Sequence, residues 1–347
     1  MRVAVRDVSE ALIGLFNDVG VKHDDAEIIV NCLVGAELAG VYTHGVRMAA
    51  DHVRKFETTY SKTGELIIEK TTASFTVCDA NNMNGMLSAW KAMEISIEKA
   101  SKTGLHAVFC HNANTLSAAY LYANQAVEKG MIGIVFCNSP AQMAPFGGRE
   151  KMLGTNPVAI GIPSKTEQPF VLDMATSAVA KSKINQAFFN GEEKIPLGWA
   201  TDSEGIPTDD PKEAVKGMLL PMAGPKGYGL AMAIDIISGL LSHAAYLDQV
   251  GRFYSKDNVG MNVGHVFMVL DPAMIYGEEF YDNIDAYLKR VRESQSATEK
   301  PVLVPGDINR ICEREIYEKG IDLPKKELND LNQLLTEHGR TQLKWTE

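Results

Sequence analysis

His44 lies between Thr43 and Gly45 in the stretch GVYTHGVRM, residues 40–48, directly after an apolar run with helical spacing. Among side chains, histidine has the unperturbed pKa nearest to neutrality, so His44 suits proton transfer. A histidine here can also cap the end of a helix, but Gly45 already supplies the permissive backbone that a helix exit needs. The stretch therefore favours His44 as a proton donor, with the hydroxyl of Thr43 placed to orient its ring.

Two other segments suit the binding of a nucleotide. In AGPKGYGLAM, 223–232, glycines and a proline flank Lys226 immediately before an apolar helical run. Glycines let a ligand approach the backbone, and a helix N-terminus offers unpaired N–H groups to an anion. A solvated lysine at a helix start is the open alternative. In LDMATS, 172–177, Asp173 ends an apolar run, where a carboxylate can accept ribose hydroxyls or cap a helix.

Turn-forming residues in PFGGREKMLGTNP, 145–157, bring Thr155 and Asn156 to a place where they can bind substrate or hold the turn before Pro157. Other chemistry lacks support in the chain. The GxGxxG and Walker A patterns are absent, and so are GxSxG and HExxH. We therefore expect neither a Rossmann nucleotide site nor a hydrolase elbow, and we expect no metal site.

The segments that position these groups follow an α/β pattern. Residues 9–20 and 24–40 carry apolar side chains at helical spacing. Continuously apolar runs rich in branched side chains favour strands covered on both faces: 106–110, 131–137, 156–163, 169–175 and 264–272. Helical patterns separate or follow them at 86–100, 117–129, 227–243, 282–294, 308–319 and 325–338. This alternation predicts an α/β fold with a largely buried sheet.

Bulk composition narrows the class of protein. The 347 residues suggest two compact units, and no window approaches 18 uninterrupted apolar residues, which argues against a membrane span. A net charge of -10 without a Lys/Arg cluster argues against nucleic acid. The five cysteines are widely spaced and odd in number, which favours free thiols in a reducing cytoplasm. Asp7 and Glu10 come too early for a secretory signal.

Seven segments, taken in chain order, resemble the malate/L-lactate dehydrogenase family of NAD(P)-dependent oxidoreductases: THG at 43–45, PFGG at 145–148, GTNP at 154–157, DMATS at 173–177, IPLGWATDSEGIPTDDP at 195–211, LPMAGPKGYGLAM at 220–232 and GHVFMVLDP at 264–272. The family is separate from the Rossmann-fold malate and lactate dehydrogenases. Its members include ureidoglycolate, sulfolactate and diketogulonate enzymes and reductases of cyclic imine carboxylates.

The resemblance implies a mixed, largely buried sheet in a non-Rossmann cofactor domain at 75–274, with a mainly helical domain formed by 1–74 and 275–347. It implies a homodimer that binds NAD or NADP, and the cysteine pattern favours a cytoplasmic location. His44 would be the proton donor, helped by Thr43, and Thr155 would touch the substrate. The residues expected at the dinucleotide are Asp173, Met174, Ala175, Lys226, Gly227, Pro305, Gly306 and Asp307.

Three positions depart from the family pattern. Met48 stands where the family has an arginine that clamps the substrate carboxylate, and Arg47, one residue earlier, is either its replacement or a solvent-facing side chain. Thr115 stands where many members carry a second histidine, with His111 four residues upstream. His52 stands where family members often have a tyrosine.

We therefore expect hydride transfer between nicotinamide and a small 2-oxo or 2-hydroxy acid such as malate, lactate or ureidoglycolate. Two alternatives stay open. One is a reductase of cyclic imine carboxylates that uses the same cofactor site. The other is a catalytically weak paralogue that binds the dinucleotide as a sensor or structural ligand.

Overall fold

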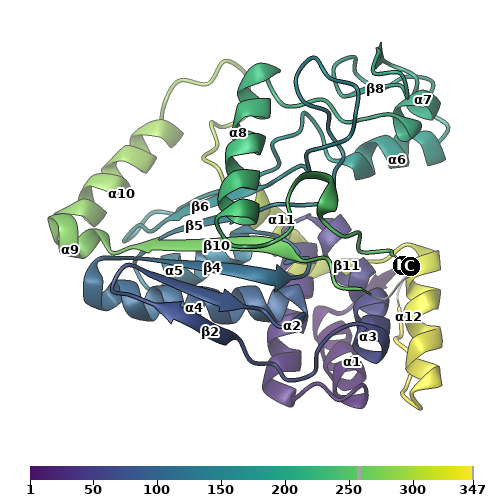
Figure 1. The fold of residues 1–347 in the computed structure, drawn as a ribbon, viewed down its shortest axis with the longest axis horizontal. Helices are drawn as coiled ribbons and strands as arrows, with labels where there is room; N and C mark the ends of the chain where they lie inside the picture. The colour runs from purple at the N-terminus through teal and green to yellow at the C-terminus, as the bar shows by residue number, and fades with distance from the viewer. Residues whose placement is uncertain (256–258, 346–347) are drawn as a thin grey trace.

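A seven-stranded mixed sheet forms the centre of the computed structural model, which describes residues 1–255 and 259–345 (Figure 1). The strand order is β2-β3-β4-β10-β5-β6-β7. The β3–β4 pair is parallel and the remaining neighbours are antiparallel. The strands are β2 (Ile67–Thr71), β3 (Phe75–Asp79), β4 (Leu105–Ala113), β5 (Ile132–Cys137), β6 (Val158–Ile162), β7 (Phe170–Met174) and β10 (Val263–Leu270). The fold is thus α/β, as expected, and unlike the parallel Rossmann sheet.

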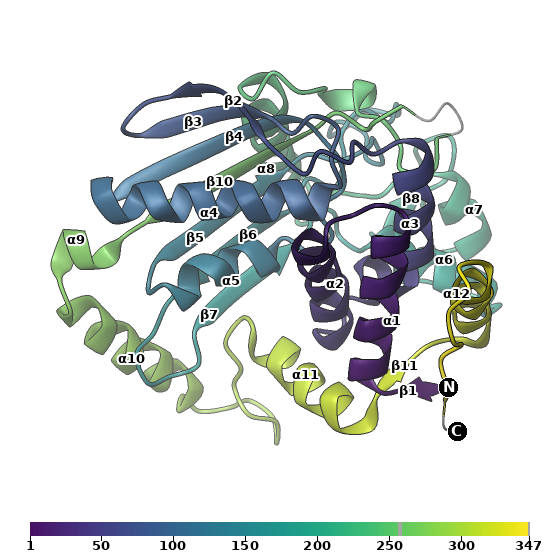
Figure 2. The same ribbon diagram turned by 90° about the horizontal axis from the view of Figure 1, so that it is seen from below.

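Helices cover both faces of this sheet, which explains its continuously apolar strands. On one face α4 (Gly85–Thr103) packs on β4 and β10, and α5 (Tyr120–Glu128) packs on β5 and β6 (Figure 2). On the other face lies α8 (Pro225–Asp235), which continues into the π-helical turn η3 (Ile236–Leu240) against β10. Val266, Phe267 and Val269 of β10 are fully buried, because this strand is central and covered twice.

The N-terminal helices and two C-terminal helices pack beside the sheet. They are α1 (Val5–Asp18), α2 (His23–Leu38), α3 (Ala49–Thr58), α11 (Asp307–Lys319) and α12 (Lys325–Glu337). Short strands β1 (Arg2–Val3) and β11 (Ile321–Asp322) pair antiparallel near them. On α1 the apolar stripe of Leu12, Leu15 and Phe16 is buried, as its helical spacing predicts. This stripe belongs to the same hydrophobic core as the sheet.

A second, smaller core lies above the sheet beside α8 (Figure 1). Its elements are α6 (Lys181–Phe189), α7 (Pro211–Lys216), β8 (Ala200–Thr201) and β9 (Pro207–Thr208). Met143, Leu153 and Leu219 are buried there, although they come from separate loops. Because the main core includes residues from both expected domains, the division into 1–74 with 275–347 and 75–274 remains a proposal.

Five further elements lie in the described residues. They are η1 (Tyr42–His44), η2 (Val46–Met48), η4 (Leu247–Gln249), α9 (Pro272–Tyr276) and α10 (Glu279–Arg292). In the part of the chain that the structure describes, no helix has the length and apolar character needed to cross a membrane.

Candidate functional site

A cavity of about 800 Å³ opens between the two cores. His44 and Met48 line it from the η1–η2 segment, and Thr115 and Ser117 line it from the end of β4. The small core contributes Lys181 at the start of α6. Thr43 and Thr155 also line the cavity, so three of the expected site residues meet there.

His44 is held by its backbone while its ring faces the cavity. The backbone N–H of His44 donates to the Val41 carbonyl at 2.9 Å, and the His44 carbonyl accepts from Ser117 Oγ at 2.6 Å. The ring is accessible from the cavity, yet protein atoms surround it. This burial lowers its pKa from 6.5, against a backbone hydrogen bond with Thr43. The neutral imidazole therefore predominates at pH 7, ready to accept a proton from an alcohol.

Glu37 of α2 fixes the turn that follows His44. Its side chain is 1% exposed, and its Oε2 accepts the Val46 N–H at 3.0 Å. Burial raises the pKa of Glu37 to about 7, although Arg47 and the Val46 N–H act in the opposite direction. Arg47 lies over the Tyr42 ring at 5.0 Å, with its Nε 3.9 Å from Glu37 Oε1. Arg47 therefore faces Glu37 and does not line the cavity.

Sequence reasoning missed Glu37, although a carboxylate within the apolar run of α2 was a usable signal. It also missed the segment 252–254, which closes the cavity beside Met48. The Tyr254 hydroxyl donates to Asp51 Oδ2 at 3.1 Å and contacts Met48 Sδ at 3.6 Å. No motif pointed to this segment, because only the fold brings it to η2.

The two other histidines named with the departures from the family pattern, His111 and His52, lie outside the cavity lining. His111 Nε2 is 3.1 Å from Glu69 Oε2 at the edge of the sheet. His52 is buried, with its Nδ1 at 3.2 Å from both the Tyr60 hydroxyl and Asn84 Nδ2. Burial lowers the pKa of His52 to about 3, so it stays neutral. His44 is thus the histidine of the described chain that lines the cavity.

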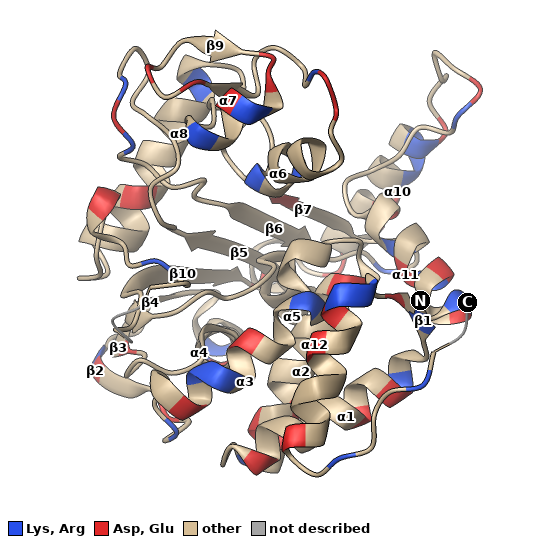
Figure 3. Ribbon diagram, turned by 90° about the vertical axis from the view of Figure 1, so that its right-hand side faces the viewer, with Lys and Arg blue, Asp and Glu red and all other residues tan. Residues whose placement is uncertain are grey.

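The cavity wall is cationic. Lys151, Lys181 and Arg252 line it, whereas among residues 1–255 and 259–345 no Asp or Glu does so. Figure 3 shows basic residues along α6 and α7, where Lys181 Nζ donates to the carbonyls of Ala214 and Val215 at 2.9 Å. Burial, together with the charge of Lys151, lowers the pKa of Lys181 to about 8. A wall of this kind favours an anionic ligand.

Backbone pairing brings the expected cofactor segments side by side next to the cavity. The Thr176 N–H and hydroxyl both donate to the Thr155 carbonyl at 2.8 Å. The Met222 N–H donates to Thr176, and the Gly227 N–H donates to Met222. Met174 and Ala175 directly precede Thr176, and Lys226 lies exposed in the first turn of α8. These segments border the cavity residue Thr155 without lining the cavity themselves.

The turn at 305–307 continues this row of paired segments (155, 174–176, 222 and 226–227), because it pairs with β7. The Val171 N–H donates to the Pro305 carbonyl at 2.9 Å. Gly306 has a φ of +99°, a conformation that favours glycine. The Asp307 carboxylate accepts from Arg292 and Arg310, and although burial acts to raise its pKa, these hydrogen bonds lower it to about 2.

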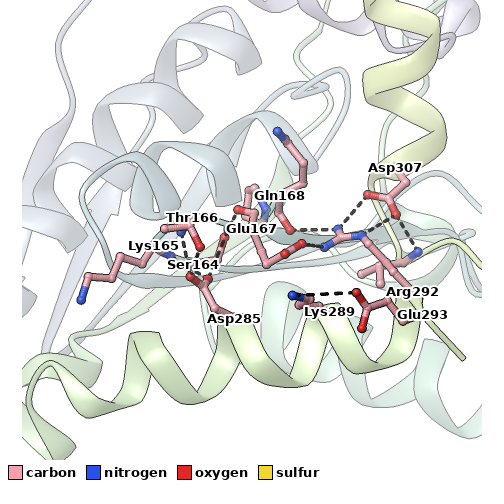
Figure 4. Close-up of polar contacts among 12 residues, drawn as sticks. Ser164, Lys165, Thr166, Glu167, Gln168, Asp285, Lys289, Arg292, Glu293 and Asp307 are labelled. Carbon is pink, nitrogen blue, oxygen red and sulfur yellow. Dashed lines mark hydrogen bonds and ion pairs between the residues drawn. The ribbon is translucent and has the colours of Figure 1, made fainter.

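Figure 4 shows that Arg292 also binds Glu167, so the Asp307 side chain ties α11 to α10 and to the β6–β7 loop. In the same view, Asp285 accepts from the backbone of Lys165 and Thr166. The side chain of Asp307 therefore holds the turn, and the backbone of Pro305 and Gly306 is what the turn can offer to a ligand.

Asp173 caps a helix that is distant in sequence. Its Oδ2 accepts the Tyr120 N–H at 3.0 Å, at the first turn of α5. Protein surrounds the carboxylate on this side, and this burial raises its pKa to about 6 despite the backbone donors of Tyr120 and Ala119. Asp173 therefore caps a helix, as one of the two interpretations of the sequence predicted, and that helix is α5. The residue is also exposed on one side, so it can still accept a hydrogen bond from a ligand hydroxyl.

The residues present fit a dinucleotide. Lys226 provides a positive charge in the first turn of α8, at the positive end of the helix dipole, and both favour a diphosphate. Gln142 lines the cavity, and its Oε1 is buried with no hydrogen-bond partner in the described chain, so it can accept the amide N–H of a nicotinamide.

Comparisons with known proteins agree over the whole length of the chain. The family model described as malate/L-lactate dehydrogenase matches residues 3–332. The malate/(S)-sulfolactate dehydrogenase of Methanothermus fervidus is 35% identical over 339 residues, covering 97% of this chain and 98% of its own. Ureidoglycolate dehydrogenase (NAD(+)) of Escherichia coli is 31% identical, covering 93% of both chains. The solved sulfolactate dehydrogenase of Methanocaldococcus jannaschii superposes with a TM-score of 0.92 at 32% identity, covering 98% of both chains.

Proposed function

Because the chain belongs to the malate/L-lactate dehydrogenase family and is a dehydrogenase of hydroxy acids, we propose that it transfers a hydride between NAD or NADP and a small 2-oxo or 2-hydroxy acid. One observation carries the proposal. The cavity combines His44 with three cationic side chains and, within the described residues, has no carboxylate in its lining. It therefore offers a proton-transfer group and an anion-binding wall in one space.

His44 is the proton-transfer group of the proposed reaction. In the oxidative direction its neutral ring accepts the proton of the substrate hydroxyl, and in the reductive direction the imidazolium returns it to the developing alkoxide. The lowered pKa makes the imidazolium a stronger acid than a free histidine. Thr43 orients the ring from the preceding position, and Thr155, which also lines the cavity, provides a hydroxyl for the substrate.

The cofactor is held, in this proposal, by the row of segments beside Thr155. Lys226 and Gly227 approach the diphosphate, Asp173, Met174 and Ala175 approach a ribose, and the turn Pro305–Gly306–Asp307 completes the row. When bound, nicotinamide supplies the site that donates or accepts the hydride. The protein supplies orientation and charge, and His44 and Thr155 face the cavity that the substrate enters.

We also propose that two chains pair through the end of α8 and the π-helical turn η3. Met232 of α8 and Ile236 and Leu240 of η3 recur every four residues, and 40%, 45% and 50% of their surfaces are exposed. A contiguous apolar stripe of this kind marks an interaction surface. Analytical ultracentrifugation should give a dimer for the native chain and a monomer for Ile236→Asp. A native chain that sediments as a monomer contradicts the pairing.

A substrate screen tests the function. Oxidation of NADH and NADPH is followed with oxaloacetate, pyruvate, 3-sulfopyruvate and Δ1-piperideine-2-carboxylate, and binding of each dinucleotide is titrated separately. Turnover with a 2-oxo acid supports the proposal. Turnover with the cyclic imine alone supports the imine reductase, and tight dinucleotide binding without turnover of any compound supports the sensor or structural role.

A further inference from the structure

The carboxylate of a 2-oxo or 2-hydroxy acid needs a cationic partner near His44. Position 48 of the cavity lining is occupied by Met48, which carries no charge. Arg47 is turned onto Tyr42 and Glu37, outside the lining. The η1–η2 segment therefore supplies the proton-transfer group without supplying an anion anchor.

Arg252 enters the cavity from a different part of the chain, on a segment with fixed ends. The Gly251 N–H donates to the Met261 carbonyl at 2.8 Å. The Met261 N–H in turn donates to Asn114 Oδ1 at 3.0 Å. Asn114 directly precedes Thr115, which lines the cavity. These contacts hold residue 252 at the end of the cavity that contains Thr115.

The two residues after Arg252 dock onto α3 and η2. Phe253 is 9% exposed, and its ring centroid lies 5.1 Å from that of His52. Tyr254 contacts Asp51 and Met48 through its hydroxyl. Phe253 and Tyr254 are thus anchored on α3 and η2, and Arg252 lines the cavity together with Met48 and His44.

The three cations of the wall are not equally available to a ligand. Lys181 Nζ donates two hydrogen bonds to carbonyls at the end of α7, and Lys151 Nζ reaches the Lys216 carbonyl at 3.5 Å. The Arg252 guanidinium, in contrast, makes no hydrogen bond or ion pair with any residue in 1–255 or 259–345. Its planar donors match a carboxylate in a bidentate geometry.

We propose that Arg252 binds the substrate carboxylate, in place of the arginine that the family resemblance implies at position 48. This inference rests on the proposed function. The substrate is anchored from the 252–254 side of the cavity, and its reacting carbon faces His44. In this proposal the carboxylate anchor is still an arginine, as the family resemblance implies, but it lies at position 252 instead of position 48. This different position determines which acids fit the cavity.

Binding of oxamate, an unreactive analogue of a 2-oxo acid, tests the anchor without turnover. Oxamate is titrated into the chain saturated with NADH or NADPH, and the nicotinamide fluorescence is followed. Arg252→Met should weaken oxamate binding about ten- to a hundredfold, as expected for one lost charge-assisted contact. Arg252→Lys should lose less, and dinucleotide affinity should stay unchanged in both. Arg149→Met, an exposed arginine outside the lining, is the matched control.

Met48→Arg in the Arg252→Met background gives a second test, because a guanidinium restored beside His44 should recover oxamate binding. Unchanged oxamate affinity in Arg252→Met overturns the assignment, and so does a loss seen in Arg47→Met alone. A native chain that binds neither dinucleotide nor oxamate refutes the proposed function. Normal dinucleotide binding with oxamate insensitive to Arg252 refutes the anchor by itself.

Discussion

Glu37 makes the stability of this chain depend on pH in a direction that is unusual for a carboxylate. Burial raises its pKa from 4.5 to about 7, so the native state holds its proton more tightly than the unfolded chain does. The contribution of Glu37 to stability is then fully present below pH 4.5 and is lost as pH rises through 7, because the native state must bury a charge that the unfolded chain exposes to water. The difference between 4.5 and about 7 corresponds to about 3 kcal/mol.

Glu37→Gln should remove this dependence. Glutamine keeps an oxygen for the Val46 N–H but cannot ionise. Between pH 5 and pH 8 the free energy of unfolding of the variant should therefore fall by about 2.5 kcal/mol less than that of the native chain. The pKa of about 7 already includes the charges of Arg47, which stabilises the ionised carboxylate, and Asp322, which opposes it. Other groups titrate equally in both proteins and cancel in the comparison.

Urea denaturation at pH 5, 6, 7 and 8 measures the difference, and Glu57→Gln on the exposed face of α3 is the matched control. The control should follow the native curve. If Glu37→Gln follows it as well, the buried carboxylate does not titrate as its surroundings imply. Glu37→Ala should also lower kcat, because an unpaired Val46 N–H costs about 1–3 kcal/mol and loosens the turn after His44.

Two further predictions concern the site itself. His44→Ala should lower kcat by about 10²–10⁴-fold with nearly unchanged dinucleotide affinity, and the oxidative pH–rate profile should lose the limb below pH 6.5. Wild-type turnover in that variant would return His44 to a structural role. Lys226→Ala should weaken NAD(P)H binding about ten- to a hundredfold, measured by fluorescence titration, while the thermal midpoint stays constant. If Lys226→Ala binds NADH and NADPH as tightly as the native chain does, Lys226 does not belong to the cofactor site.

Local pattern determined the elements of this fold well. The five expected strands lie at β4, β5, β6, β7 and β10, and the expected helices lie at α1, α2, α4, α5, α8, α10, α11 and α12. Periodicity is readable from sequence because it reports how each residue alternates between core and solvent. Sequence reasoning missed β2 and β3, and it missed the helices α3, α6 and α7. β2 carries no periodic pattern because it is exposed along its whole length.

Motifs likewise pointed to His44, Thr43 and Thr155, which the structure brings to one cavity. They also indicated the segments at 173–175, 226–227 and 305–307, which backbone pairing places in one row. Each of these residues stands in a short stretch whose glycines, prolines and polar groups mark a turn, and turns at strand and helix ends are where ligands meet the backbone.

Only the tertiary structure decided which side chains line the cavity. Sequence alone cannot tell whether Arg47 or Arg252 lines the cavity. The orientation of each side chain depends on partners such as Glu37 and Asn114 that lie elsewhere in the chain. The same holds for Asp173, whose carboxylate caps a helix that begins 53 residues earlier. β10 runs between β4 and β5, and this register carries the residues before it to the end of β4, beside Thr115. Sequence pattern records the burial of each residue, whereas a cavity is formed by residues that are distant in sequence and meet only when the strands pair.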